Sequence, residues 1–115
     1  MFNYTELSPE RCEFVAVAES QELNDGDRLR FEIDWQPIVI FRIAGELYAI
    51  GDVCSHDDGP LGDGELDGLE VTCPRHGARF DVRNGEVKSP PAAVDIPAYP
   101  VREEDGEIFI GLPLD

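Results

Sequence analysis

The chain has 115 residues and carries 9 lysines plus arginines against 25 aspartates plus glutamates, a formal net charge of −16. Such a charge repels nucleic-acid phosphates and anionic lipid headgroups, which argues against both as partners. It leaves two roles open for the acidic surface: steering towards a basic protein partner, or solubility alone. The length predicts one domain over residues 1–115, and a hydrophobic fraction of 42% is enough for one core.

Short apolar segments separated by turn signals run along the whole chain, and no segment has the pattern of an amphipathic helix. Asn-Gly and Asp-Gly dipeptides between the segments favour tight hairpins. One hairpin is expected through Ala44-Gly45-Glu46 and another through Arg83-Asn84-Gly85. Short strands at this close spacing predict an all-β, antiparallel sandwich or barrel. The expected strands are Glu13–Ala18, Arg28–Ile33, Pro37–Ile43, Glu46–Ile50, Leu69–Thr72, Arg79–Val82, Val94–Ile96, Pro100–Arg102 and Glu107–Gly111.

The cellular setting is expected to be a reducing cytoplasm. The N-terminal residues have neither a basic region nor a long apolar run, so they do not read as a signal peptide, and no stretch has the length of a membrane span. Three cysteines cannot form a fully paired disulfide framework, so metal binding or packing is the usual explanation for them. Cys12 is expected to be a packed thiol, and Trp35, like the phenylalanines, is expected in the core rather than at a cofactor.

The chain has only two histidines, and each stands close to a cysteine. Cys54 and His56 form a C-x-H pair, and Cys73 and His76 form a C-x-x-H pair. Each pair follows a predicted strand, and the first begins in a segment, Gly51–Gly68, that is rich in Gly, Asp and Pro. A long loop inside a compact domain is usually functional. Thiolate and imidazole together favour zinc or iron–sulfur chemistry over calcium or magnesium.

Three kinds of site could use such pairs. A structural zinc site fits the ligand count, although zinc fingers usually place two cysteines together and two histidines together. A catalytic Cys–His dyad would use one pair and leave the other idle. A binuclear iron–sulfur cluster suits the mixed pairs best, because each loop can give one thiolate and one imidazole.

The two motifs, their order and their spacing resemble the Rieske [2Fe–2S] family, and the resemblance extends over essentially the whole chain. It implies a Rieske-like antiparallel β-sandwich with a small cluster-binding subdomain, with cluster-binding loops at about 51–68 and 73–80 and a shielding proline loop at 89–92. It further implies that Cys54 and Cys73 bind the inner iron of the [2Fe–2S] cluster, while His56 and His76 bind the outer one near the protein surface.

Departures from the respiratory members of this family are informative. Gly59 and Arg75 stand where those proteins have a pair of disulfide-forming cysteines, and Ala78 and Phe80 stand where they have hydroxyl groups that donate to the cluster and to a cysteine sulfur. Fewer hydrogen bonds to sulfur stabilise the reduced state less, so a potential at the low end of the Rieske range is expected. The respiratory type is therefore disfavoured.

The resemblance thus points to a soluble ferredoxin rather than an enzyme. Its expected role is to pass one electron at a time from an NAD(P)H-dependent flavin reductase to a terminal, aromatic-ring-hydroxylating oxygenase. A terminal oxygenase would need further histidines for a mononuclear iron, and both are already assigned to the cluster. The alternatives are the small Rieske subunit of an assimilatory nitrite reductase and, from a different class, a structural zinc-binding module.

Charged residues beside the motifs carry two open interpretations. Asp57 and Asp58 follow His56 directly, and their negative charge is expected to lower the potential further. Arg75 and Arg79 flank the second histidine; they could orient a partner, offset the charge of the reduced cluster, or form a surface ion pair with one of these aspartates.

Overall fold

The computed structural model describes residues 3–7, 9–54, 60–75, 77–90 and 94–114. Three single-turn 3-10 helices lie in the N-terminal region, and every strand pairing among the described residues is antiparallel. In chain order the elements are η1 (Tyr4–Glu6), η2 (Pro9–Arg11), β1 (Cys12–Glu19), η3 (Ser20–Glu22), β2 (Arg28–Ile33), β3 (Gln36–Ile43), β4 (Glu46–Gly51), β5 (Leu66–Asp67), β6 (Glu70–Thr72), β7 (Arg79–Asp81), β8 (Val87–Ser89), β9 (Ala98–Tyr99), β10 (Val101–Glu104) and β11 (Glu107–Pro113).

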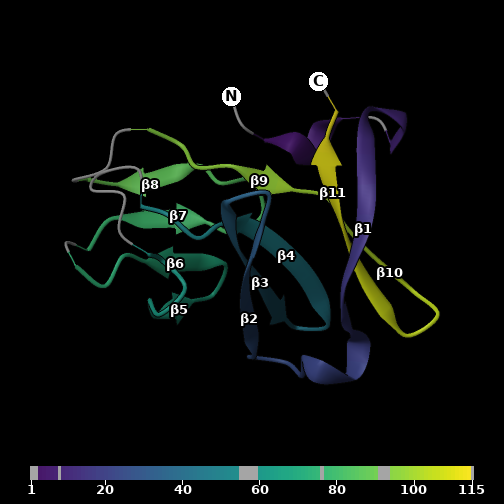
Figure 1. Cartoon of the computed structure of the whole chain (residues 1–115). Coiled ribbons are helices and arrows are strands. Elements are labelled where there is room, and N and C mark those ends of the chain that lie inside the picture. Colours follow the sequence, from purple (N-terminus) through teal and green to yellow (C-terminus); the bar gives the residue numbers. More distant parts are fainter. Residues whose placement is uncertain (1–2, 8, 55–59, 76, 91–93, 115) are drawn as a thin grey trace.

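The strands form three sheets, in the orders β1-β11-β10, β2-β3-β4-β9 and β5-β6-β7-β8. Figure 1 shows the first two packed as a sandwich and the third set to one side as a small subdomain. The predicted all-β class with an antiparallel sandwich and a small subdomain is therefore confirmed. None of the helices in the described part of the chain is long and apolar enough to cross a membrane.

Strand β3 is the shared wall of two hydrophobic cores, because it is apolar on both faces. Its residues Ile38, Val39, Ile40 and Phe41 are all fully buried. Successive side chains of a strand point to opposite faces, so Ile38 and Ile40 enter one core while Val39 and Phe41 enter the other. Burial of each such side chain contributes about 1.5–3 kcal/mol. The unbroken apolar run is therefore what places β3 in the middle of the molecule.

The two cores divide the molecule into a sandwich and a subdomain. The first core fills the space between the sheet of β2-β3-β4-β9 and the sheet of β1-β11-β10, with Ile108 and Ile110 of β11 facing β3. The second core joins the other face of β3 and β4 to the small sheet, through Val71 of β6 and Phe80 of β7. The subdomain thus has no separate core of its own; it packs directly on the sandwich.

Both predicted hairpins are present. Strands β3 and β4 are joined through Ala44 and Gly45, which both have positive φ (52° and 84°), as a tight two-residue hairpin turn requires. Strands β7 and β8 are joined across Arg83-Asn84-Gly85, where the Gly85 amide donates to the carbonyl of Asp81 at 2.8 Å. Gly85 has a φ of +77°, and a Cβ there would lie 2.0 Å from the Ile96 carbonyl oxygen, so only glycine fits.

Two sequence-based predictions about this part of the fold are wrong. Residues Val94–Ile96 form no strand; the short strand β9 begins two residues later, at Ala98. The Asp95 carboxylate accepts the Val87 amide at 2.9 Å, and Pro97 has no amide hydrogen to donate, so a continuous ladder cannot form here.

Trp35 is the other correction, because it is 90% exposed rather than in the core. It lies in the turn that joins β2 to β3, where Ile33 pairs with Gln36. Its side chain therefore points away from both cores. Cys12, in contrast, is buried at the start of β1, as expected for a packed thiol.

Candidate metal centre

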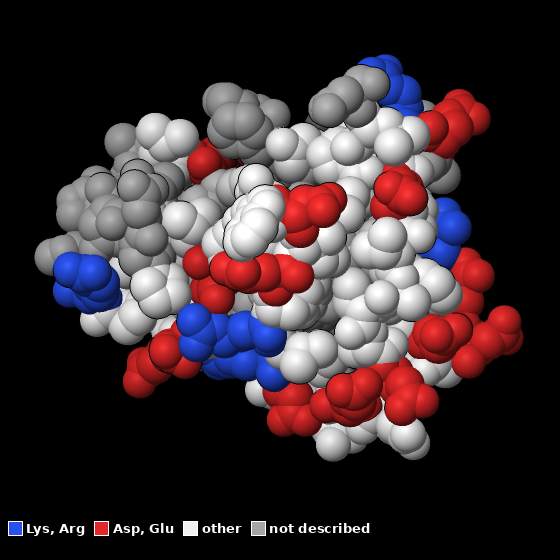
Figure 2. All heavy atoms as spheres, viewed as in Figure 1, with Lys and Arg blue, Asp and Glu red and all other residues white. Residues whose placement is uncertain are grey.

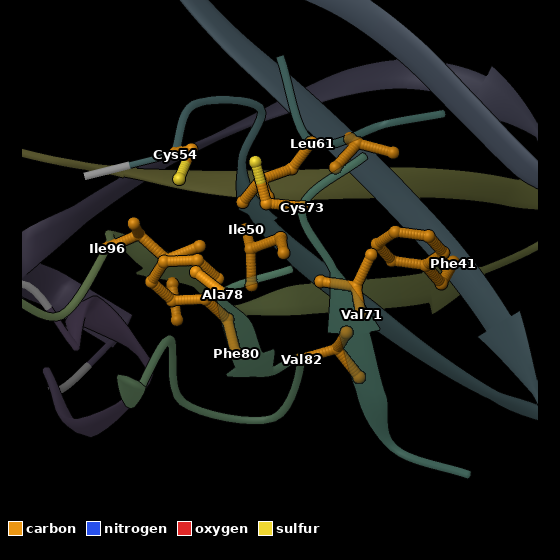
Figure 3. Packing of buried hydrophobic residues seen from close by; sticks show 12 residues of the cluster. Phe41, Ile50, Cys54, Leu61, Val71, Cys73, Ala78, Phe80, Val82 and Ile96 are labelled. Carbon is orange, nitrogen blue, oxygen red and sulfur yellow. The ribbon is translucent and has the colours of Figure 1, made fainter. Parts of the chain in front are cut away.

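The two cysteines of the predicted site lie in the same buried cluster. Cys54 follows the end of β4 and is fully buried, and Cys73 follows β6 directly and is 1% exposed. Figure 3 shows both sulfur atoms at the upper side of that cluster, with Cys73 drawn beside Leu61. Two strand ends from different sheets therefore place the two thiols in one buried cluster.

His56 and His76 lie outside the described residues, as do 55, 57–59 and 91–93. The prediction that both imidazoles complete the site stays a prediction, and so does the shielding role of the proline loop 89–92. Of that loop, the described residues Ser89 and Pro90 stand at and just after the end of β8.

The second loop, 73–78, is held closed by its own backbone. The Cys73 amide donates to the Ala78 carbonyl at 2.7 Å, and the Gly77 amide donates back to the Cys73 carbonyl at 3.0 Å. Gly77 adopts a φ of +80°, a conformation that other residues adopt only with strain. The loop therefore turns tightly around Cys73.

The first loop is closed by a buried carboxylate that the sequence analysis did not single out. Asp52 is 8% exposed, and its Oδ1 accepts the amides of Leu61 and Gly62 at 2.8 and 2.5 Å. Its Oδ2 accepts the Arg30 Nε at 2.9 Å. That hydrogen bond is the main cause of the raised pKa of Arg30. The sequence signal that could have identified this contact is an aspartate two residues before the candidate ligand Cys54, with the Leu61-Gly62 pair at the far end of the same loop.

Strand β2 supports the returning part of this loop. The Arg28 Nη1 donates to the carbonyl oxygens of Gly62 and Gly64 at 2.7 and 2.5 Å, and its guanidinium lies 5.1 Å from the centre of the Phe41 ring. A Cβ at Gly64 would lie 1.9 Å from the Thr72 carbonyl oxygen, so this residue must be glycine. The two loops are thus in backbone contact just before Cys73.

The surroundings of the two thiols are apolar and provide no side-chain hydroxyl at the two positions considered above. Ala78 and Phe80 are both fully buried. The three cysteines, all of them described, form no disulfide. A pair of buried thiols in an apolar cluster, each just after the end of a strand, fits a metal group that takes thiolate ligands.

Arg79, beside the second loop, forms ion pairs with two acidic residues of the small sheet. Arg79 pairs with Asp67 at 2.8 Å and with Glu70 at 3.1 Å. The hydrogen bond to Asp67 is the main cause of the raised pKa of Arg79. The alternative partners Asp57 and Asp58 lie outside the described residues. On the face drawn in Figure 2, acidic side chains outnumber basic ones and lie mainly in the middle and along the right and lower parts of the view.

Comparison with known proteins identifies the family. The model of the Rieske [2Fe-2S] domain matches residues 13–100. A curated relative, the 3-phenylpropionate/cinnamic acid dioxygenase ferredoxin subunit of Escherichia coli K12, is 40% identical over 94 residues, which cover 80% of this chain and 87% of the relative.

Solved structures agree with this match. The ferredoxin of carbazole 1,9a-dioxygenase from Nocardioides aromaticivorans IC177 is 33% identical, with a TM-score of 0.80 over 84% of this chain and 95% of that one. The ferredoxin of Sphingomonas yanoikuyae B1 is 28% identical, with a TM-score of 0.80 over 88% of this chain and 100% of that one.

The chain therefore belongs to the Rieske [2Fe–2S] domain family. Its cofactor is a [2Fe–2S] cluster, and its role is electron transfer rather than catalysis. This assignment removes the structural zinc module as an alternative.

Proposed function

We propose that Cys54 and Cys73 hold one iron of the cluster, that His56 and His76 hold the other, and that the single domain 1–115 carries one electron per encounter. The observation that supports this most directly is the pair of buried thiols, each just after the end of a strand and both in one cluster. When bound, the cluster supplies a site that takes up and releases one electron. Imidazole ligands leave it less negative than a four-thiolate cluster and so raise its potential above that of plant-type ferredoxins.

Within the Rieske range of roughly −150 to +300 mV, this chain belongs near the low end. Ala78 and Phe80 offer no hydroxyl to the cluster or to the Cys73 sulfur, although both are buried beside it. A low potential suits an electron that comes from a nicotinamide-linked flavin.

The proposed donor is an NAD(P)H-dependent flavin reductase, and the proposed acceptor is a terminal, aromatic-ring-hydroxylating oxygenase. A complex of reduced oxygenase and oxidized ferredoxin in carbazole 1,9a-dioxygenase contains a chain that is 27% identical to this one, with a TM-score of 0.81 over 89% of this chain and 95% of that one. The curated relatives are named as dioxygenase ferredoxin subunits, which favours this role over that of a nitrite reductase subunit.

A net charge of −16 favours partners that present a basic surface. A reducing, cytoplasmic location accords with three cysteines that form no disulfide.

The test is assembly of the cluster on the parent chain and on matched variants. Parent protein expressed with iron and sulfide is expected to be coloured and, once reduced, to give an electron-spin signal with a mean g value below that of the free electron. Cys54→Ser, His56→Ala, Cys73→Ser and His76→Ala are expected to abolish that signal. Cys12→Ser is the control, because Cys12 is equally a buried cysteine but lies at the start of β1.

The outcomes separate the alternatives. Colourless parent protein would overturn the proposed ligand set, and so would a histidine variant with the parent signal. A second assay mixes NADH, a flavin-dependent ferredoxin reductase and the coloured protein: bleaching at the rate of reductase turnover is expected, and no bleaching would overturn the proposed donor.

A further inference from the structure

Both carboxylate oxygens of Asp52 are hydrogen-bonded, and neither the family match nor the ligand set gives this residue a role. We propose that Asp52 is a positioning residue for the cluster: its carboxylate joins the two ends of the first loop and thereby fixes where Cys54 stands. This inference rests on the ligand set proposed above.

The first step of the argument is the geometry of loop closure. Asp52 lies two residues before Cys54, and the amides it binds belong to Leu61 and Gly62, at the far end of the same loop. The Asp52 amide itself donates to the Pro37 carbonyl of β3 at 2.9 Å. One residue therefore ties the start of the loop, the end of the loop and the central strand together.

The second step is that both carboxylate oxygens are occupied by donors. Oδ1 takes the two amides, and Oδ2 takes the Arg30 Nε. Only 7% of the Asp52 side chain is exposed. A buried carboxylate is tolerated only when it is paired and hydrogen-bonded. Loss of the carboxylate would leave two buried amides and part of a guanidinium without acceptors, so the loop could not keep its present closure.

The third step compares Asp52 with Asp63, the other carboxylate that pairs with Arg30. Arg30 also pairs with Asp63 at 2.9 Å, but Asp63 is 72% exposed and has no bond to the loop amides. Arg28, from the same strand, holds the carbonyls of Gly62 and Gly64. The returning end of the loop is thus fixed on β2, and Asp52 connects it to the end that carries Cys54. A plain surface ion pair would not make that connection.

The experiment compares three variants of the cluster-bearing protein. Asp52→Ala removes the acceptor and the charge, Asp52→Asn removes the charge but keeps one oxygen for the two amides, and Asp63→Asn is the matched control because it removes the same charge beside the same arginine. The measurements are the rate at which the visible absorbance of the cluster is lost, the g values of the reduced protein and the midpoint potential.

The expected result is a graded loss. Asp52→Ala should lose the cluster at least tenfold faster than the parent and give a shifted or broadened electron-spin signal. Asp52→Asn should keep the parent g values and raise the midpoint potential, because the charge and the acceptor for Arg30 have gone while one oxygen still accepts the two loop amides. Asp63→Asn should match the parent in loss rate and g values.

Several outcomes would overturn the inference. One is a coloured Asp52→Ala protein whose loss rate and g values equal those of Asp63→Asn, since a merely structural residue would leave the centre unchanged. If Asp52→Ala does not accumulate, the comparison passes to Asp52→Asn: we expect faster hydrogen exchange at the Leu61 and Gly62 amides and faster cluster loss than in Asp63→Asn, and equality of the two overturns the inference. A parent protein that takes up no cluster would instead count against the ligand set itself.

Discussion

The exposed Trp35 gives a sharp prediction about stability, because its backbone is strained and its side chain buries almost nothing. Its φ is +69°, and that of Asp34 before it is +50°, as in a two-residue hairpin turn of type I′. Non-glycine residues in this conformation lose about 1–2 kcal/mol relative to glycine. Glycine also gives the unfolded chain more conformational freedom, which lowers the free energy of unfolding by about 0.4–1 kcal/mol and offsets part of the relieved strain. Because 90% of the side chain is already exposed, little hydrophobic burial is lost.

The net expectation for Trp35→Gly is a gain of roughly 0.5–1 kcal/mol in the free energy of unfolding, or about 2–5 °C in the melting temperature. Trp35→Asn should gain a similar amount, because asparagine tolerates positive φ. The assay is thermal unfolding followed by far-ultraviolet circular dichroism on cluster-bearing protein kept free of oxygen. The g values and midpoint potential should stay at their parent values.

Trp35→Ala is the matched control for this prediction. It removes the same indole ring but keeps a Cβ, so the backbone strain remains and no stabilisation is expected. If the glycine and asparagine variants melt at or below the alanine variant, the reasoning from φ is refuted. The indole would then stabilise the chain by contacts that its exposure does not reveal.

Three further predictions concern the potential of the cluster and the response to acid. Ala78→Ser should raise the midpoint potential measured by redox titration, because a hydroxyl at this buried position can donate to the cluster; a midpoint at or below that of the parent contradicts the placement of loop 73–80. The double change Asp57→Asn with Asp58→Asn should also raise the midpoint, since two negative charges beside a proposed iron ligand are removed; an unchanged value would refute this role of the charges. The Arg42 guanidinium, by hydrogen bonding, lowers the pKa of Glu103 to about 2, so this pair stabilises the fold above the unfolded pKa of 4.5 and loses that contribution as the pH falls from about 4.5 to about 2. Denaturant titrations across that range should show a smaller acid-induced loss in Glu103→Gln than in the parent, by no more than about 1 kcal/mol, because the pair is partly exposed; equal losses would contradict the assignment.

The sequence predicted best where local chemistry and burial act together. The apolar run in β3 needs burial on both faces, and β2 was predicted with its observed ends at Arg28 and Ile33. The hairpin through Ala44 and Gly45 could be predicted because Gly45 adopts a positive φ without strain. Motif spacing placed Cys54 and Cys73 each just after a predicted strand. The structure has both thiols in one buried cluster.

Prediction from the sequence fails where the surroundings of a residue in the folded chain, rather than its local sequence, decide its position. Residues Val94–Ile96 have the composition of a strand, yet the Asp95 carboxylate takes the Val87 amide that strand pairing would use. Trp35 carries a large, mainly apolar ring, but the two-residue loop between β2 and β3 leaves it no core to enter. Asp52 looks like one of 25 acidic residues until the loop closes around it. These surroundings are visible only in three dimensions.

The arrangement of β3 explains how a site built on loops can still be rigid. Val39 and Phe41 form part of the core that contains Cys54 and Cys73, while Ile38 and Ile40 on the opposite face are locked into the sandwich. Any movement of the cluster loops that displaced β3 would therefore have to disturb both cores, and packed interiors resist such changes. A one-electron carrier benefits from this, because a centre whose ligands hardly move between oxidation states exchanges electrons with little reorganisation. The Asp52 contacts to Leu61, Gly62 and Arg30 extend the same rigidity from the strands into the loop that carries Cys54.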